Sequence, residues 1–299
     1  MNDALPPIGP NIPGLTPALR HRLRVLLRLA GALHPSWAAR LALRLFTTPR
    51  ARALCAQDSI FLAGAAATRL ETARGELQLY EWPGAGPAVL VLHGWISHAA
   101  RLREIIEILC GRGLRVVTFD APAHGRSPGR RLDLPMYREA MAAVAAACGP
   151  IGAVVAHSFG ALTALSWLAE RPAGSNLRAA VLVGVPHDAG YLLDAFASAM
   201  GLEAAVLTRL RGLFRARYGD DPEGFSAARL AQQLRVPLLL VHGGADEFVP
   251  AAHSAAVAQS VAGARLHVAP GLLHSGPLRD PATLELMADF IAGHLQESQ

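Results

Sequence analysis

The sequence predicts an α/β protein with a doubly wound, mostly parallel sheet, interrupted by a helical lid and preceded by an N-terminal helical extension. Two observations predict the sheet. From residue 67 onward, short apolar runs alternate with segments of helical periodicity, and the runs are apolar throughout, as in strands buried on both faces of a parallel sheet. The chain has 299 residues, of which 52% are hydrophobic, enough to bury a large core without disulfides or metals. We therefore expect a domain over 67–299 and a basic amphipathic helical extension over 1–66.

The elements of this domain follow one another in a regular order. A hairpin is expected about Ala73-Arg74-Gly75, and Gly84 to Pro87 reads as a turn. Helical periodicity then alternates with the apolar runs. The expected strands are 67–71, 76–82, 88–92, 116–119, 153–156, 179–185, 237–241 and 266–268, and the expected helices lie near 98–110, 135–148, 159–170, 251–262 and 281–294.

The N-terminal segment is basic and amphipathic. Leucines recur at helical spacing over 18–33, and a second helix is expected from Pro35 until Pro49 stops it. Residues 1–52 hold eight arginines against Asp3, a charge of +7, whereas the whole chain carries +5. The apolar stripes either pack on the rest of the domain or lie on an anionic membrane, so peripheral membrane contact through residues 18–52 is one interpretation. No nucleic-acid partner is expected, because no aromatic residues alternate with the arginines to stack on bases.

Residues 188–235 interrupt the alternation with 48 residues that contain no expected strand. Their helix-like stretches predict an inserted lid. An apolar stripe at near-helical spacing predicts that the lid contacts an apolar acyl or alcohol group, or else that the stripe packs on the main domain. The stripe consists of Tyr191, Leu192, Leu193, Phe196, Met200, Leu202 and Val206.

Composition excludes several kinds of chemistry. All 28 basic residues are arginine, and the absence of lysine excludes a Walker A phosphate loop, a Schiff-base enzyme and a pyridoxal site. The three cysteines are widely spaced without a CxxC pair, and the twelve histidines show no HExxH spacing, so we expect no metal and no organic cofactor. No apolar run reaches the length of a membrane span, and the first residues lack the order of a signal peptide. The expected location is cytoplasmic, with membrane association as the alternative.

A serine stands where the run 153–156 passes into a helix. In Ala156-His157-Ser158-Phe159-Gly160, small residues two before and two after the serine suit a sharp elbow at which strand and helix nearly touch. Such an elbow exposes Ser158 Oγ and places the Phe159 backbone N–H at a helix N-terminus, where it can donate to an oxyanion. Ser158 is therefore the candidate nucleophile, although a serine that merely caps the helix would give the same local pattern.

Residues that could take part in catalysis follow three other apolar runs. Residues 88–92 are followed by His93-Gly94-Trp95, where the backbone N–H of Trp95 can supply a second oxyanion donor. Asp246 follows 237–241, and His274 follows 266–268. Ligands of doubly wound sheets gather beyond the carboxyl ends of the strands, so these residues are expected to meet in one site.

In this order and at these places, Ser158, Asp246 and His274 resemble the catalytic residues of the α/β-hydrolase fold family, and the resemblance covers roughly residues 67–295. It implies Ser158 as nucleophile, His274 as general base and then acid, and Asp246 as the residue that orients the imidazole. It further implies an oxyanion hole formed by the backbone N–H groups of Trp95 and Phe159, and a helical cap over 188–235. The sequence departs from the family's G-x-S-x-G pattern at Ala156. Asp188, just past the preceding strand, is an alternative position for the acid.

The expected reaction is hydrolysis of a carboxylic ester of an apolar, small or medium-sized substrate through an acyl-enzyme. A serine at position 158 excludes a dehalogenase or an epoxide hydrolase of this fold, which would need aspartate there. The same three residues also allow amide hydrolysis, acyl transfer or carbon–carbon bond cleavage. A non-catalytic module that binds a small ligand or a membrane partner is the alternative from a different class.

Overall fold

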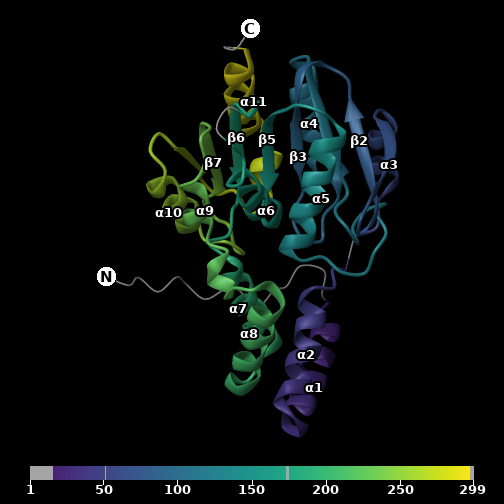
Figure 1. Cartoon of the computed structure of the whole chain (residues 1–299), viewed down its shortest axis with the longest axis vertical. Coiled ribbons are helices and arrows are strands. Elements are labelled where there is room, and N and C mark those ends of the chain that lie inside the picture. The colour runs from purple at the N-terminus through teal and green to yellow at the C-terminus, as the bar shows by residue number, and fades with distance from the viewer. Residues whose placement is uncertain (1–15, 51, 173–174, 297–299) are drawn as a thin grey trace.

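The computed structural model of the protein describes residues 16–50, 52–172 and 175–296. Its centre is one eight-stranded sheet in the order β1-β2-β4-β3-β5-β6-β7-β8 (Figure 1). Only the β1–β2 and β2–β4 pairs are antiparallel, so the expectation of a mostly parallel sheet is confirmed. The strands are β1 (Ala66–Thr72), β2 (Gly75–Trp82), β3 (Ala85–Leu92), β4 (Leu114–Phe119), β5 (Ile151–His157), β6 (Ala179–Val183), β7 (Leu238–Gly243) and β8 (Arg265–Ala269).

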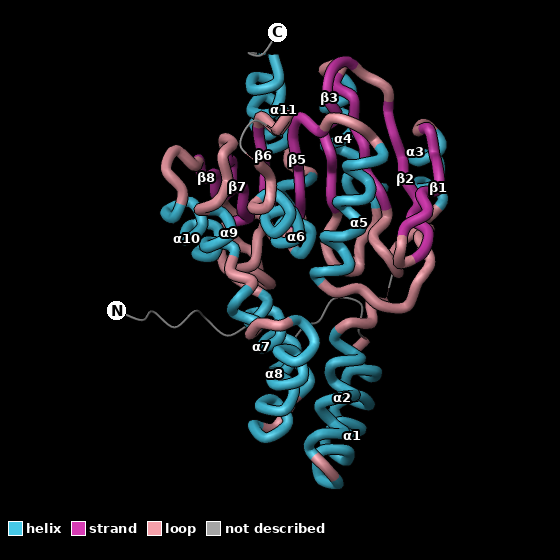
Figure 2. Tube along the Cα trace, in the orientation of Figure 1, coloured by secondary structure: helices cyan, strands magenta, loops and turns pink. Residues whose placement is uncertain are grey.

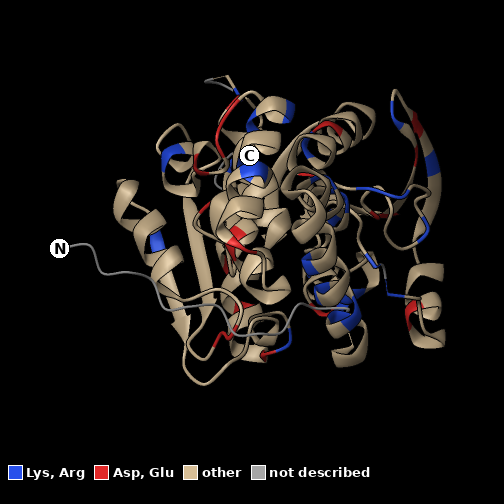
Figure 3. Ribbon diagram, turned by 90° about the horizontal axis from the view of Figure 1, so that it is seen from below, with Lys and Arg blue, Asp and Glu red and all other residues tan. Residues whose placement is uncertain are grey.

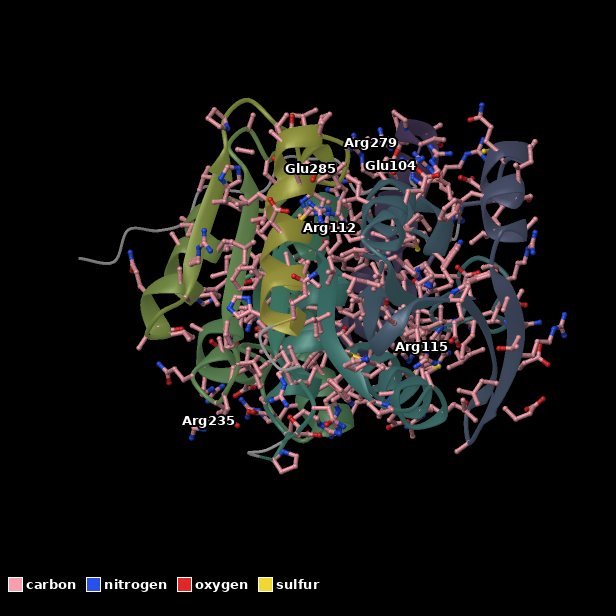
Figure 4. All side chains as sticks on the ribbon, turned by 90° about the horizontal axis from the view of Figure 1, so that it is seen from above. Glu104, Arg112, Arg115, Arg235, Arg279 and Glu285 are labelled. Carbon is pink, nitrogen blue, oxygen red and sulfur yellow. The ribbon has the colours of Figure 1, made fainter. Side chains whose placement is uncertain are left out.

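Helices cover both faces of the sheet (Figure 2). On one face lie α4 (Arg103–Gly111) and α11 (Pro281–Gln296), which Arg112 links through ion pairs to Glu285 and Asp289 (Figure 4). Alternate residues of each central strand point to opposite faces, so that Val89 packs towards α4 and Leu90 towards the opposite layer. This opposite layer consists of α5 (Leu134–Ala147), α6 (Phe159–Leu168), α9 (Ala227–Ala231) and α10 (Ala252–Ser260).

Two helices between β6 and β7, α7 (Ala189–Met200) and α8 (Ala204–Tyr218), project beyond the carboxyl ends of the strands (Figure 1). The Asp188 carboxylate caps α7 by accepting from Tyr191 N, and the helix ends at Gly201, whose φ of 62° suits glycine. The short η2 (Pro222–Gly224) leads back to the sheet layers.

The N-terminal extension packs on these two helices. It forms α1 (Pro17–Leu33) and α2 (Pro35–Phe46), each begun by a proline in its first turn. A shared apolar core joins the two pairs, and the Phe46 and Phe196 rings lie 5.4 Å apart. We call α1, α2, α7 and α8 together the cap. Its core consists of Leu27, Ala38, Ala39, Ala42, Leu193, Phe196, Met200, Val206 and Leu210.

Two local expectations were wrong. The helix α3 (Ala56–Ala63) has no counterpart among the expected helices, and it begins with a reciprocal cap between Cys55 and Asp58. The expected turn at Gly84 to Pro87 is largely strand, because β3 begins at Ala85 and contains an irregularity before Val89. Gly84 is needed there, since a Cβ would lie 2.2 Å from the backbone of β4.

Candidate active site

The candidate nucleophile stands on a strained elbow between β5 and α6. Ser158 has φ 55° and ψ −121°, a backbone conformation that non-glycine residues adopt only where the surrounding structure holds them. The elbow needs small neighbours, because a Cβ on Gly160 would lie 2.4 Å from the carbonyl oxygen of His93. Ala156 is almost completely buried, so its methyl group fits where the family pattern has glycine.

A hydrogen-bonded chain runs from this serine to a buried carboxylate. Ser158 Oγ lies 2.9 Å from His274 Nε2, and His274 Nδ1 lies 2.6 Å from Asp246 Oδ2. The other carboxylate oxygen, Oδ1, accepts from the backbone N–H groups of Phe248 and Val249, each at 2.9 Å. A carboxylate cannot donate, so His274 Nδ1 carries the proton, and Nε2 is left to accept from the serine hydroxyl.

A second histidine holds the Asp246 carboxylate from behind. His242 is fully buried, and its Nε2 lies 3.1 Å from Asp246 Oδ2 and 2.8 Å from the carbonyl oxygen of Val249. Ser254 Oγ lies 2.6 Å from His242 Nδ1 and donates to it, because Nε2 faces only acceptors and must carry the ring proton. Burial alone would raise the pKa of Asp246, but the hydrogen bonds from His242 and His274 outweigh it and lower that pKa. Asp246 is therefore ionised.

The two candidate oxyanion donors lie close together, Trp95 in the loop after β3 and Phe159 at the start of α6. The Trp95 and Phe159 rings meet edge to face with centroids 5.5 Å apart, and a Cβ on Gly94 would lie 3.1 Å from Ser158 Cβ. Ile96, next to Trp95, has a strained φ of 54° and donates its N–H to His124 Nε2 at 3.1 Å. The loop after β4, which contains His124, therefore fixes the loop that carries the Trp95 amide.

The histidine before the serine contacts His274. His157 Nε2 lies 3.2 Å from the carbonyl oxygen of His274, and the two rings lie 4.7 Å apart. Burial and the neighbouring His274 lower the pKa of His157 to about 3, so this ring is neutral and can donate to that carbonyl. Sequence reasoning did not assign this role to His157. Its only signal was its place beside the serine.

The alternative acid lies elsewhere. Asp188 Oδ2 is 2.7 Å from His187 Nδ1, and its other oxygen caps α7. The structure brings Asp246, and not Asp188, into hydrogen-bonding distance of His274.

A cavity of about 580 Å³ opens beside Ser158 and His274. Its far walls are apolar and come from both halves of the cap. The N-terminal extension thus contributes to the cavity, which the sequence did not indicate. The apolar side chains of this wall are Leu23, Leu45, Phe46, Leu192, Phe196, Met200 and Phe214.

No group of three or more potential metal ligands occurs within residues 16–50, 52–172 and 175–296. None of the helices in those ranges combines the length and the apolar composition needed to cross a membrane.

Acidification should destabilise the fold between about pH 6.5 and pH 4. Burial lowers the pKa of His124 and His253 to about 4 and that of His157 to about 3, against 6.5 for an ordinary histidine. Between these pH values the three histidines bind protons in the unfolded chain but stay neutral in the folded chain. Each histidine should therefore lower the free energy of unfolding by roughly 1 kcal/mol per pH unit as the pH falls.

The measurement is thermal unfolding at pH 7, 6 and 5 at constant ionic strength. Equal melting temperatures at pH 7 and pH 5 would show that these rings do not stay neutral in the folded chain.

The strand order and the serine elbow together define the α/β-hydrolase class of fold. Comparisons with known proteins agree. A family model described as serine aminopeptidase, S33, matches residues 85–226. An uncharacterized protein of Mycobacterium tuberculosis is 30% identical over 224 residues, which cover 72% of each chain. The chain belongs to the α/β-hydrolase family.

Other similar proteins have named activities. A monoacylglycerol lipase of Mycolicibacterium smegmatis is 27% identical over 247 residues, which cover 69% of this chain and 88% of the lipase. The solved structure of an esterase of Pyrococcus furiosus superposes with a TM-score of 0.62 at 18% identity, covering 83% of this chain and 99% of the esterase. At that identity the esterase structure supports the fold alone.

Proposed function

We propose that this chain is a serine hydrolase that cleaves carboxylic esters of apolar, small or medium-sized substrates through an acyl-enzyme. The observation that carries the proposal is the hydrogen-bonded chain from Ser158 Oγ through His274 to the buried Asp246. A second hydrogen bond from His242 keeps the Asp246 carboxylate ionised and in place. The apolar cavity wall of the cap suits an apolar acyl or alcohol group.

The reaction would proceed in two balanced steps. Ser158 Oγ attacks the ester carbonyl while His274 Nε2 takes the hydroxyl proton, and the oxyanion accepts from the backbone N–H groups of Trp95 and Phe159. The imidazolium returns the proton to the leaving alcohol, which leaves an acyl-serine. Water then attacks the acyl-serine, gives its proton to His274 and releases the acid when the proton returns to Ser158.

Two measurements on purified protein test this proposal. p-Nitrophenyl esters of increasing acyl length should be hydrolysed, and a fluorophosphonate should label Ser158 covalently. Turnover of anilides, of an acyl acceptor other than water or of a diketone-like acid in preference to esters would instead select the amide, acyl-transfer or carbon–carbon alternative. Absence of both turnover and labelling would leave the non-catalytic module as the better description.

We also propose that the cap contacts an anionic phospholipid surface. One face of α1 and α2 packs on α7 and α8, but another face exposes apolar side chains, with Leu29 61% and Leu33 77% exposed. The two helices carry six arginines and no acidic residue, so an anionic bilayer complements their charge (Figure 3). The exposed apolar residues are Val25, Leu26, Leu29, Leu33 and Trp37.

The protein should therefore sediment with phosphatidylglycerol vesicles at low salt and be released as salt rises. Leu29→Gln combined with Leu33→Gln should weaken this binding, because both side chains are exposed and belong to the proposed contact. The matched control is Ile60→Gln on α3, which removes a 73%-exposed side chain elsewhere and should leave binding unchanged.

Deleting the extension would not be a clean test, because Leu27 and Ala38 are buried in the cap core and their loss would expose α7 and α8. Failure of the full-length protein to sediment with anionic vesicles at low salt would remove the membrane proposal. The role of α1 and α2 would then be to pack on α7 and α8.

A further inference from the structure

Four arginines line the cavity that opens beside Ser158 and His274. Arg101 follows the loop of the Trp95 amide on η1 (Ala99–Leu102), and Arg279 follows His274 at the end of η3 (Gly276–Leu278). Arg50 and Arg52 come from the segment that links the cap to α3. We call these four residues the arginine cluster. They come from three separate parts of the chain and line the same cavity as Ser158 and His274.

The positive charge of the cluster is not balanced by carboxylates of the residues that the structure describes. Among these residues, Asp133 is the only acidic one that lines the cavity, and its carboxylate is engaged by Arg217 and Tyr218 of α8. None of the four side chains in the cluster forms a hydrogen bond or an ion pair with any other residue in the described ranges.

Arg101 shows this imbalance most clearly. It is half-buried, and burial together with the nearby charges of Arg279 and Arg52 lowers its pKa. The two carboxylates close enough to oppose this effect are already engaged. Asp58 accepts from Cys55 N at 2.9 Å, and Glu104 pairs with Arg103 at 3.4 Å. An anion in the cavity would relieve this repulsion, since removing a charge from water costs free energy that pairing with an opposite charge offsets.

The cavity is thus lined by both charged and apolar side chains. The cap contributes Phe46, Phe196 and Met200. Arg101 and Arg279 follow the loops that carry the Trp95 amide and His274, and Arg52 is near enough to Arg101 to act on its charge. The guanidinium group presents its donors in a planar fork that matches a carboxylate or a phosphate, which is the chemistry that two or more convergent arginines select.

We propose that the arginine cluster binds an oxyanionic group of the substrate, a carboxylate or a phosphate, so that the preferred substrate is an ester with one apolar end and one anionic end. This inference rests on the proposed serine hydrolase function and names its substrate class. Neutral esters would still reach Ser158 but would lack the contact with the cluster.

Matched substrates test the inference. On the alcohol side, 4-hexanoyloxybenzoate and 4-hexanoyloxyphenyl phosphate are compared with the neutral methyl 4-hexanoyloxybenzoate. On the acyl side, the mono-4-nitrophenyl ester of adipic acid is compared with 4-nitrophenyl hexanoate. We expect kcat/KM for at least one anionic ester to exceed that of its neutral partner by about tenfold or more, since one charge-assisted hydrogen bond suffices for such a ratio. The preference should shrink as salt rises.

Substitutions locate the preference. Arg101→Gln and Arg279→Gln should each lower the anionic-to-neutral ratio of kcat/KM by about tenfold. Arg235→Gln is the control, because Arg235 is exposed, lies outside the cavity and is far from Arg279 (Figure 4). This substitution should change kcat/KM for neither the anionic nor the neutral ester. As a readout without turnover, hexyl phosphate should bind the Ser158→Ala protein by calorimetry, and Arg101→Gln added to that protein should weaken this binding.

The outcomes separate the two proposals. An enzyme that hydrolyses the neutral esters with no preference for any anionic partner overturns the substrate class and leaves the hydrolase proposal intact. A preference that survives the replacement of all four arginines by glutamine also overturns it, because the anion must then be held elsewhere. Absence of turnover for every ester, together with absence of fluorophosphonate labelling, overturns the hydrolase proposal and with it the inference drawn from it.

Discussion

Replacing Ser158 by alanine should lower ester turnover by about four to six orders of magnitude. In the proposed mechanism the hydroxyl forms the bond to the substrate, and its hydrogen bond to His274 Nε2 is the contact through which the proton would leave. His274→Ala should cost about as much, and the double variant should be hardly slower than either single variant, because the two residues act as one unit.

Both variants should keep the fold. Ser158 lies at the surface of the cavity, and alanine occupies the same backbone conformation without adding a polar group or a larger side chain. Steady-state rates and melting curves are therefore measured side by side. Retention of more than about a tenth of the rate in either folded variant would remove that residue from the mechanism.

Asp246→Asn should slow turnover by about four orders of magnitude. The asparagine amide can turn its NH₂ group towards His274, so that His274 Nδ1 would accept a hydrogen bond instead of donating one. The ring proton would then lie on Nε2, the nitrogen that should accept the proton of Ser158. Asp188→Asn is the matched control, because it makes the same chemical change at the alternative acid position. It should have little effect on the rate, since Asp188 contacts His187 and the start of α7 but not His274.

The ranking of these two variants is the result that matters. Slower turnover in Asp188→Asn than in Asp246→Asn would move the acid to the end of β6. Melting curves must accompany the rates, because Asp188 caps α7, although asparagine is about as good an N-cap as aspartate and should keep the start of this helix.

The sheet could be predicted well because buried parallel strands have almost no polar positions. All eight expected strands are present, and the parallel order follows from the alternation of strands and helices. In a doubly wound sheet, ligands gather beyond the carboxyl ends of the strands, and this rule predicted that Ser158, Asp246 and His274 would meet. The structure brings the three residues together. Their catalytic roles are the predictions that the variants above test.

Features that depend on an unusual helix cap or on long-range contacts could not be predicted. The helix α3 is short, and its start depends on a cysteine cap that propensity alone does not indicate. The amphipathic pattern of α1 and α2 showed that they bury a face but not which partner they meet. The arginine cluster is assembled from residues 50, 52, 101 and 279, each an ordinary surface residue in the linear sequence.

The cap joins the two ends of a long stretch of chain, and this affects its biosynthesis. Its first half ends at Phe46, whereas its second half is complete only at Tyr218. At about 5–20 residues per second, a ribosome needs roughly ten to thirty seconds to make the residues between them. For that time Leu27, Ala38 and Ala42 lack their partners on α7 and α8, and the hairpin of α1 and α2 offers an apolar surface to chaperones and to other nascent chains. The chain therefore completes the wall of its cavity late in its own synthesis.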